Sequence, residues 1–270
     1  MSDESTQDPE RPSSPRRPPV PEAMTPAGWS FLRENNRLVG FVFYITRLAT
    51  STDEKARIAV RALYETEDPE TYRSSLEKIE KEGATQELRK QHRDMVLEMM
   101  LSRLAENFLV YVTELLTLIF RTRPETLRSS ETVRLDAILK HGTMEELVHD
   151  LAERRVNQLS YQGMRDLAAY LSNRLGFDIF SGCEQLERAI RIIESRNVIV
   201  HNRGRVSELF RSRVPSVPVV IGEPLKLDGH GIFGDLEFLT LSVIEADARA
   251  VQKFELQADP MGHSEQPPRR

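Results

Sequence analysis

The chain has 270 residues, of which 39% are hydrophobic, so it is long enough to bury one good core or a core with an extension. Its net charge of −5 and its pI of about 5.8 exclude a general electrostatic affinity for duplex nucleic acid. A single cysteine, Cys183, excludes intrachain disulfides and cysteine-rich metal sites. The chain lacks a signal-peptide pattern and an uninterrupted apolar run of membrane-spanning length, so we expect a cytoplasmic protein without membrane contact.

The N-terminal part of the chain divides into a tail and a helical extension. Residues 1–25 are rich in Ser, Pro and Arg, which predicts a disordered tail. Residues 26–84 are expected to form the extension, and the capping-box spacing of Ser51-Thr52-Asp53-Glu54 predicts a new helix start within it. The expected helices of the extension span about residues 29–50, 51–63 and 69–81.

Residues 85–257 are expected to form the main helical domain, followed by a second disordered tail over residues 258–270. The longest helical pattern of this domain runs from Thr85 to Phe120, and Pro124 prevents its continuation. Its second half is apolar on more than one face, which is typical of a central core helix. The other expected helices span about residues 143–159, 164–175, 182–202 and 233–254.

The connecting segments carry weaker patterns. Two short helix starts are expected, one near Thr122 and one near Ser129. Residues 214–224 mix valines with prolines and are expected to form an extended segment or a small hairpin, and Gly229-His230-Gly231 is expected to be a turn. Together the patterns predict an all-α fold, a helical bundle with an N-terminal helical extension.

The helix expected over residues 182–202 ends in the most informative stretch of the chain. Ser181-Gly182-Cys183-Glu184 has capping-box spacing, and Asn202 and Gly204 tolerate the left-handed conformation that closes a helix. At about 100° per residue, Asn197 continues an apolar stripe, so an amide occupies a core-like position. The stripe consists of Leu186, Ile190 and Ile193.

The last turns of the same helix are apolar on several sides. Val200 stays near the stripe, whereas Val198 and Ile199 point well away from it. A helix with this pattern is usually enclosed, either by its own domain or by a partner chain. We therefore expect a second surface over the helix end, and a homodimer is the hypothesis that supplies one.

Arg196, the polar Asn197, an apolar triplet and His201 stand together at this helix end. They resemble the signature of the HEPN superfamily, in which an arginine, commonly followed by a polar residue, precedes a histidine by four to six residues. The flanking segments resemble the bacterial group labelled RiboL-PSP-HEPN. The resemblance covers roughly residues 85–257 and implies a HEPN-like helical bundle for them.

The resemblance also implies a function. Active members of the superfamily are metal-independent endoribonucleases in which two motifs meet across a homodimer. By this resemblance Arg196, Asn197 and His201 are the catalytic residues. An imidazole can move a proton near neutral pH, and a guanidinium can neutralise charge on the phosphate. The implied substrate is RNA, cut by its own 2′-hydroxyl, and a toxin or defence role with an antitoxin protein as partner belongs to the same hypothesis.

A local group of arginines offers an RNA-binding surface. The group consists of Arg196, Arg203, Arg205, Arg211 and Arg213, which lie within eighteen residues. Arginine suits phosphate because its planar fork donates two parallel hydrogen bonds, and we expect Asn202, Arg203 and Arg205 to bind substrate. The alternative is a solvated linker that happens to be basic. The acidic bulk charge favours single-stranded or loop RNA over long duplexes, which need many phosphate contacts.

Two other classes of function fit the same residues. The first is a non-catalytic HEPN module that dimerises or binds RNA or protein without cutting. The second is a plain helical interaction protein, in which Arg196 and His201 are cations favoured by the dipole at a helix C-terminus. The sequence has no Gly-rich phosphate loop, nucleophile elbow or zinc-spaced cluster, so no cofactor and no metal is expected.

Overall fold

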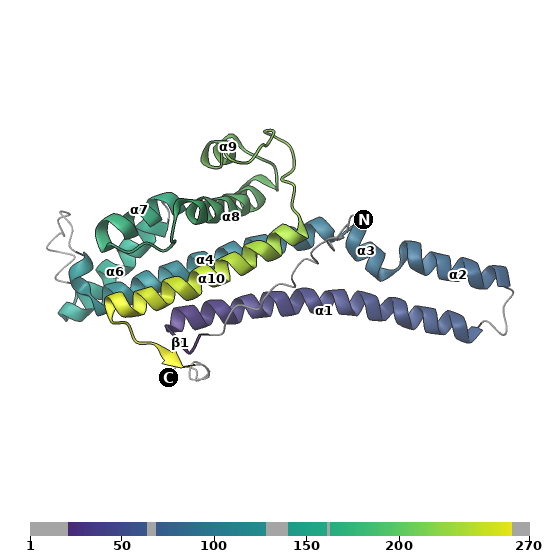
Figure 1. The fold of residues 1–270 in the computed structure, drawn as a ribbon, viewed down its shortest axis with the longest axis horizontal. Helices are drawn as coiled ribbons and strands as arrows, with labels where there is room; N and C mark the ends of the chain where they lie inside the picture. Colours follow the sequence, from purple (N-terminus) through teal and green to yellow (C-terminus); the bar gives the residue numbers. More distant parts are fainter. Residues whose placement is uncertain (1–20, 64–68, 128–139, 161–162, 261–270) are drawn as a thin grey trace, which may run out of the picture.

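The computed structural model describes residues 21–63, 69–127, 140–160 and 163–260. Within these ranges the chain is almost entirely helical, which confirms the expected all-α fold (Figure 1). The helices are α1 (Pro26–Leu63), α2 (Pro69–Glu82), α3 (Ala84–Lys90), α4 (Arg93–Thr122), the 3-10 helix η1 (Pro124–Leu127), α6 (Met144–Ser160), α7 (Met164–Leu175), α8 (Cys183–Asn202), α9 (Glu208–Arg213) and α10 (Gly229–Phe254). Two short strands, β1 (Ala23–Met24) and β2 (Asp259–Pro260), pair antiparallel.

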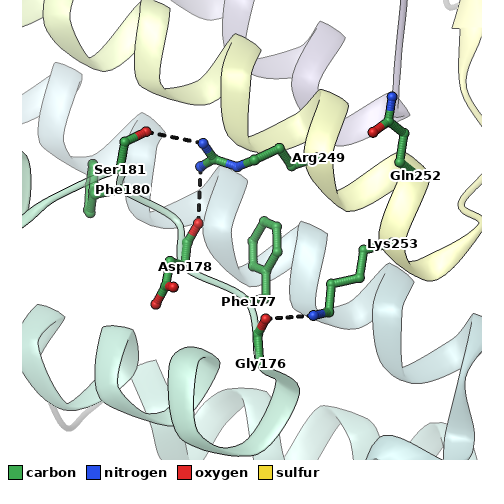
Figure 2. A pocket seen from close by; sticks show the side chains of 8 residues that line it. All are labelled: Gly176, Phe177, Asp178, Phe180, Ser181, Arg249, Gln252 and Lys253. Atoms are coloured by element: carbon green, nitrogen blue, oxygen red, sulfur yellow. Dashed lines mark hydrogen bonds between the residues drawn. The ribbon is translucent and has the colours of Figure 1, made fainter.

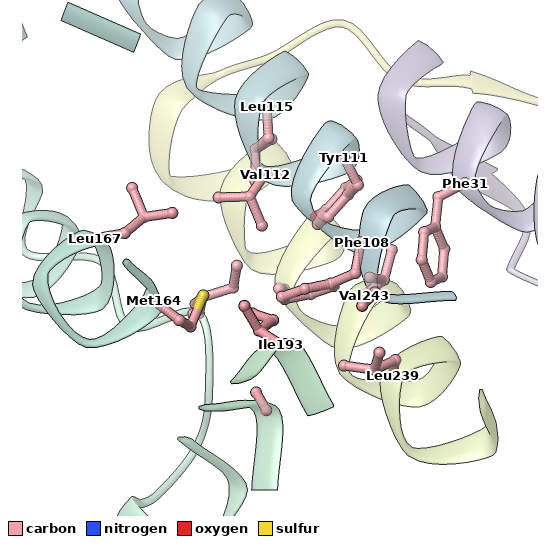
Figure 3. Close-up of a cluster of buried hydrophobic side chains, with 14 of the residues drawn as sticks. Phe31, Phe108, Tyr111, Val112, Leu115, Met164, Leu167, Ile193, Leu239 and Val243 are labelled. Carbon is pink, nitrogen blue, oxygen red and sulfur yellow. The ribbon is translucent and has the colours of Figure 1, made fainter. Parts of the chain in front are cut away.

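Helix α4 is the central element of the bundle. It contacts α1, α6, α8 and α10, and Figure 1 shows α10 beside it, with α7 and α8 on one side of this pair and α1 on the other. Phe108 of α4 is fully buried, and side chains from α1, α8 and α10 surround it (Figure 3). Burial on several sides matches the apolar pattern of its second half, so the expected central core helix is confirmed. The other labelled members of this cluster are Phe31, Tyr111, Val112, Leu115, Met164, Leu167, Ile193, Leu239 and Val243.

Helix α1 runs unbroken through the position where the sequence predicts a new helix start. The hydroxyl of Thr52 donates to the carbonyl oxygen of Leu48 at 2.9 Å, a bond typical of a threonine in a helix interior. The carboxylate of Asp53 accepts hydrogen bonds from the backbone N–H groups of Ala84 and Thr85, at 2.8 and 2.9 Å. Asp53 is therefore a capping residue, but it caps α3 across the chain. The predicted break in α1 was wrong.

Other boundaries also differ from the expected ones. The pattern that begins at Thr85 is divided into α3 and α4, and α10 begins at Gly229 because the Asp228 carboxylate accepts from the N–H of Gly231 at 2.9 Å. The expected turn at residues 229–231 was wrong, since these residues form the first helical turn. Residues 214–224 contain neither helix nor regular strand, apart from one isolated bridge to Pro224. The helix start expected near Ser129 lies outside the described residues.

The N-terminal extension starts later along α1 than the sequence indicates. Trp29, Phe31 and Asn35 are buried in the main body, whereas most α1 side chains beyond residue 39 are exposed or half-buried. Figure 1 shows the second half of α1 and α2 leaving the body side by side, with α3 at their base. We call residues 45–90 the arm. Its few buried side chains mean that local contacts such as the Asp53 cap matter to its stability.

We expect the Asp53→Ala variant to destabilise the arm by about 1 kcal/mol, the usual loss for an N-cap carboxylate. Burial raises the pKa of the Asp53 carboxyl, but hydrogen bonds from Thr85 and Ala84 outweigh it, so the pKa lies below the ordinary 3.8. The charged cap therefore stabilises the arm fully above that pH and is lost as the pH falls through the lowered folded pKa. Amide hydrogen exchange at Ala84 and Thr85 measures this, with the exposed neighbour variant Glu54→Ala as control. Equal exchange in the two variants at pH 7 would contradict it.

Both ends of the described chain are attached to the body. The backbone N–H and the hydroxyl of Thr25 donate to the Asp247 carboxylate at 2.8 and 2.6 Å, and β1 pairs with β2. Burial raises the pKa of Asp247 above its ordinary value. Residues 23–25 and 259–260 are thus ordered parts of the fold, although the sequence assigns them to tails. None of the described helices combines the length and apolar character needed to cross a membrane.

Candidate site at the C-terminal end of α8

Helix α8 follows its expected bounds closely, but its start is capped differently. Gly182 is the N-cap residue, and it has no side chain to accept a hydrogen bond. The backbone N–H of Ser181 donates to Oε1 of Gln185 at 2.9 Å, while the Ser181 hydroxyl accepts from Arg249 of α10 at 3.2 Å. The predicted serine cap was wrong because a tertiary contact with α10 occupies that hydroxyl.

The chain leaves α8 through two consecutive left-handed residues. They are Arg203, with φ of 53°, and Gly204, with φ of 72°, and the N–H of Gly204 bonds to the carbonyl oxygen of Val198 at 3.1 Å. Asn202 is the last helical residue, so the left-handed role was predicted correctly for Gly204 and wrongly for Asn202. A Cβ at Gly204 would lie 2.9 Å from Oε1 of Glu98, which would have to move aside, and the positive φ makes any side chain at this position strained. This turn directs the chain into α9.

A buried carboxylate connects the motif with α9. The Glu194 side chain is only 7% exposed; its Oε1 accepts from Nη1 of Arg213 at 2.8 Å, and its Oε2 accepts from Nδ2 of Asn197 at 3.3 Å. Oδ1 of Asn197 accepts from Nη1 of Arg196 at 3.3 Å. Sequence reasoning missed Glu194 as a site residue. The available signal was its position three residues before Asn197, one helical turn away.

Arg196, Asn197 and His201 lie on one side of the last two turns of α8. At 100° per residue these positions span about 140° of the helix circumference, and Val200 falls among them. We call these four residues the motif face. Arg196 and Asn197 are half-buried, His201 is exposed and Val200 is 50% exposed. The motif face therefore combines an apolar residue with polar groups around it.

The apolar end of α8 is partly enclosed by its own chain. Val198 is only 2% exposed, α9 packs against α8, and Phe210 of α9 belongs to the same buried cluster. Ile199 is partly buried and packs against this cluster. Of the two expected kinds of enclosure, by its own domain or by a partner chain, Val198 shows the first, since it is buried within its own chain. Val200 and Leu209 remain about half-exposed.

The expected substrate-binding residues divide into two kinds. Asn202 Nδ2 donates to the carbonyl oxygen of Arg205 at 3.2 Å, and Arg205 Nη1 donates to the carbonyl oxygen of Gly222 at 2.9 Å, so this pair braces the turn. His201 and Arg203 are exposed, and within the described ranges neither side chain has a hydrogen-bond or ion-pair partner. The basic group is also smaller than the sequence suggests. Arg211 pairs with Glu208, and Arg213 pairs with Glu194.

A second concentration of cations lines a hollow of about 550 Å³ between α10 and the segment joining α7 to α8 (Figure 2). Arg249 donates to the carbonyl oxygens of Asp178 and Ile179 at 3.0 and 3.1 Å, and Lys253 donates to that of Gly176 at 2.6 Å. Gly176 ends α7 in the left-handed conformation. These cations satisfy carbonyl groups that follow a helix, so they hold the α7–α8 connection to α10.

The end of α8 presents an imidazole, an amide and guanidinium groups on one exposed surface. Such groups can move a proton and bind a phosphate. Across the described ranges, no group of three or more His, Cys, Asp or Glu side chains could hold a metal ion. No protein-family model, curated protein or solved structure matches this chain.

Proposed function

We propose that this protein is a metal-independent endoribonuclease that cuts single-stranded or looped RNA at a site formed by the motif faces of two copies. The motif face carries the proposal, because it holds Arg196, Asn197 and His201 together beside the half-exposed Val200. His201 and Arg203 have no partner among the described residues, so their donors are free for a substrate. The resemblance of this helix end to the HEPN signature supports the same assignment.

The proposed reaction uses the 2′-hydroxyl of the RNA. A base removes the hydroxyl proton, the 2′-oxygen forms a bond to the adjacent phosphorus, and the bond from phosphorus to the 5′-oxygen breaks as an acid protonates that oxygen. His201 transfers the proton, and Arg196 donates to phosphate oxygens as negative charge develops on them. The products are a 2′,3′-cyclic phosphate and a 5′-hydroxyl.

Two copies of the protein supply the second imidazole that one helix end lacks. A single imidazole cannot act as base and acid within one displacement, whereas a symmetric pair places two imidazoles and two guanidinium groups around one phosphate. Val200 on the motif face and Leu209 on α9 are aliphatic side chains that a twofold contact would bury. The apolar side chain of Val198 gives no support for a partner chain, since it is buried within its own chain.

The test is RNA cleavage in the presence of EDTA. The substrate is an end-labelled hairpin with a single-stranded loop, compared with a variant that carries deoxyribose at the cut position. We expect cuts in the loop that survive the chelator, a terminal 2′,3′-cyclic phosphate by mass spectrometry, and resistance of the deoxy substrate because its attacking hydroxyl is missing. A need for divalent metal, or equal cutting of the deoxy substrate, contradicts the proposed mechanism.

The second candidate function is RNA binding without cleavage by a non-catalytic HEPN module. One observation favours it: within the described ranges no group bonds to the imidazole of His201, so nothing orients the ring. If this function is correct, the fluorescence anisotropy of the labelled hairpin should rise when the protein is added, and no cleavage product should form. The antitoxin partner implied by the resemblance is a further proposal, which co-purification from the native host tests.

A further inference from the structure

We propose that Glu194 and Arg213 are positioning residues that set the orientation of Arg196, acting through Asn197. This inference rests on the proposed function and adds two residues to it. The structure joins the four side chains in the order Arg213, Glu194, Asn197 and Arg196, by contacts of 2.8, 3.3 and 3.3 Å. Arg213 lies on α9, so a second helix contributes to the orientation of the phosphate-binding group.

The chemistry of the contacts permits one orientation of the Asn197 amide. An ionised carboxylate only accepts hydrogen bonds and a guanidinium only donates them. The amide must therefore turn its NH2 group towards Glu194 and its carbonyl oxygen towards Arg196, as observed. The opposite orientation would place oxygen against oxygen and N–H against N–H. Glu194 therefore determines that Arg196 contacts the carbonyl oxygen of the Asn197 side chain.

The burial of the Glu194 carboxylate restricts which groups can contact it. The Glu194 side chain is 7% exposed, and a carboxylate removed from water needs charged or polar partners. Arg213 is 44% exposed and reaches Glu194 from α9. The Ser207 hydroxyl caps α9 by accepting from the N–H of Phe210 at 3.1 Å, and the fully buried Phe210 ring anchors the helix to the core. The cation that neutralises Glu194 is therefore attached to an anchored element.

Arg196 gains a defined direction from this chain of contacts. One of its terminal N–H groups bonds to Asn197, which orients the planar fork while leaving other donors for a phosphate. A misplacement of about 1 Å in a catalytic group can lower a rate about a hundredfold. We therefore expect loss of Glu194 or Arg213 to slow cleavage about tenfold to a hundredfold, because the fork of Arg196 loses its orientation.

The test compares matched variants in single-turnover cleavage. Glu194→Gln keeps the shape of the side chain but removes its charge and lets the amide of Asn197 reverse, and Arg213→Gln removes the cation. The control is Glu208→Gln, which removes the charge of the exposed partner of Arg211 on the same short helix, an ion pair of 3.5 Å. We expect the first two variants to be slowed and the control to stay within about twofold of wild type.

Coupling to Arg196 separates positioning from a purely structural role. If Glu194 acts through Arg196, Glu194→Gln should cause little further slowing in an Arg196→Lys background, while its effect on the melting temperature persists. If Glu194 only holds α9 in place, the two slowing factors should multiply. Multiplicative slowing overturns the inference, and so does a Glu194→Gln variant with wild-type activity.

A second measurement does not depend on cleavage. In NMR spectra, the Asn197 side-chain amide and the Arg196 Nε–H signals should shift in Glu194→Gln and Arg213→Gln but not in Glu208→Gln. If the wild type fails to cut RNA and these shifts appear, the proposed function fails and the positioning stands. If the wild type cuts RNA, His201→Ala does not, and the shifts are absent, the function stands and the positioning is overturned.

Discussion

We expect the His201→Ala variant to cut RNA about 10²–10⁴ times more slowly than wild type, the usual contribution of general acid–base catalysis. The loss should appear in the chemical step, because the imidazole transfers protons while the arginines bind phosphate. Stability should change by no more than about 0.5 kcal/mol, since His201 is exposed. His230, exposed on the first turn of α10, provides the matched control, and His230→Ala should remain fully active.

Arg196→Lys tests the other half of the same chemistry. Lysine keeps the positive charge but cannot present a planar fork to a phosphate or make the same contact with Asn197. We expect cleavage slowed at least about tenfold at unchanged ionic strength. Single-turnover rates and thermal melts of both variants provide the measurement. If His201→Ala and Arg196→Lys both cut as fast as wild type, the motif is not catalytic and the non-catalytic module is the better interpretation.

The Val200→Glu variant should prevent the proposed composite site from forming. Val200 is 50% exposed in the folded chain, so a glutamate there leaves folding nearly intact. In a twofold contact the same change brings two carboxylates together in a desolvated interface. We expect the dimer Kd to rise at least about a hundredfold, which corresponds to about 2.7 kcal/mol, and cleavage to fall with the dimer population.

Light scattering and analytical ultracentrifugation measure this effect. Ile58→Glu is the control, because Ile58 is β-branched, 66% exposed and part of the arm, whose helices leave the body in Figure 1. The control should leave both dimer and activity unchanged. A wild-type monomer that cuts RNA at the same rate across a wide concentration range would show that one copy is sufficient, and the composite site would be wrong.

Several features of this protein follow from short stretches of sequence. The bounds of α7 and α8 agree with the expected ones within about one residue, because apolar spacing and end signals such as Gly176 act within a few turns. Thr143, the residue before α6, caps that helix through a purely local bond, since its hydroxyl accepts from the N–H of Glu146 at 3.1 Å. The all-α class and the grouping of Arg196, Asn197 and His201 on one side of a helix follow from the same local regularity.

The errors arise where a local signal is used by a distant segment. Asp53 carries the capping signal that the sequence suggests, yet it caps α3, 31 residues along the chain. Ser181 has capping-box spacing, but its hydroxyl bonds to Arg249. In both cases the same side-chain group can bond locally or across the fold, and packing decides which partner lies within reach.

The site shows the same division between sequence and tertiary structure. Helical periodicity determines that Arg196, Asn197 and His201 share a surface, because their spacing alone places them there. Only the fold decides that Val198 is covered by the protein's own chain and that Glu194 meets Arg213. The contact between Glu194 and Arg213 depends on the left-handed turn at Gly204, after which α9 lies against α8. A periodic pattern specifies which side chains share one side of a helix. The segment that packs against that side depends on the path of the rest of the chain.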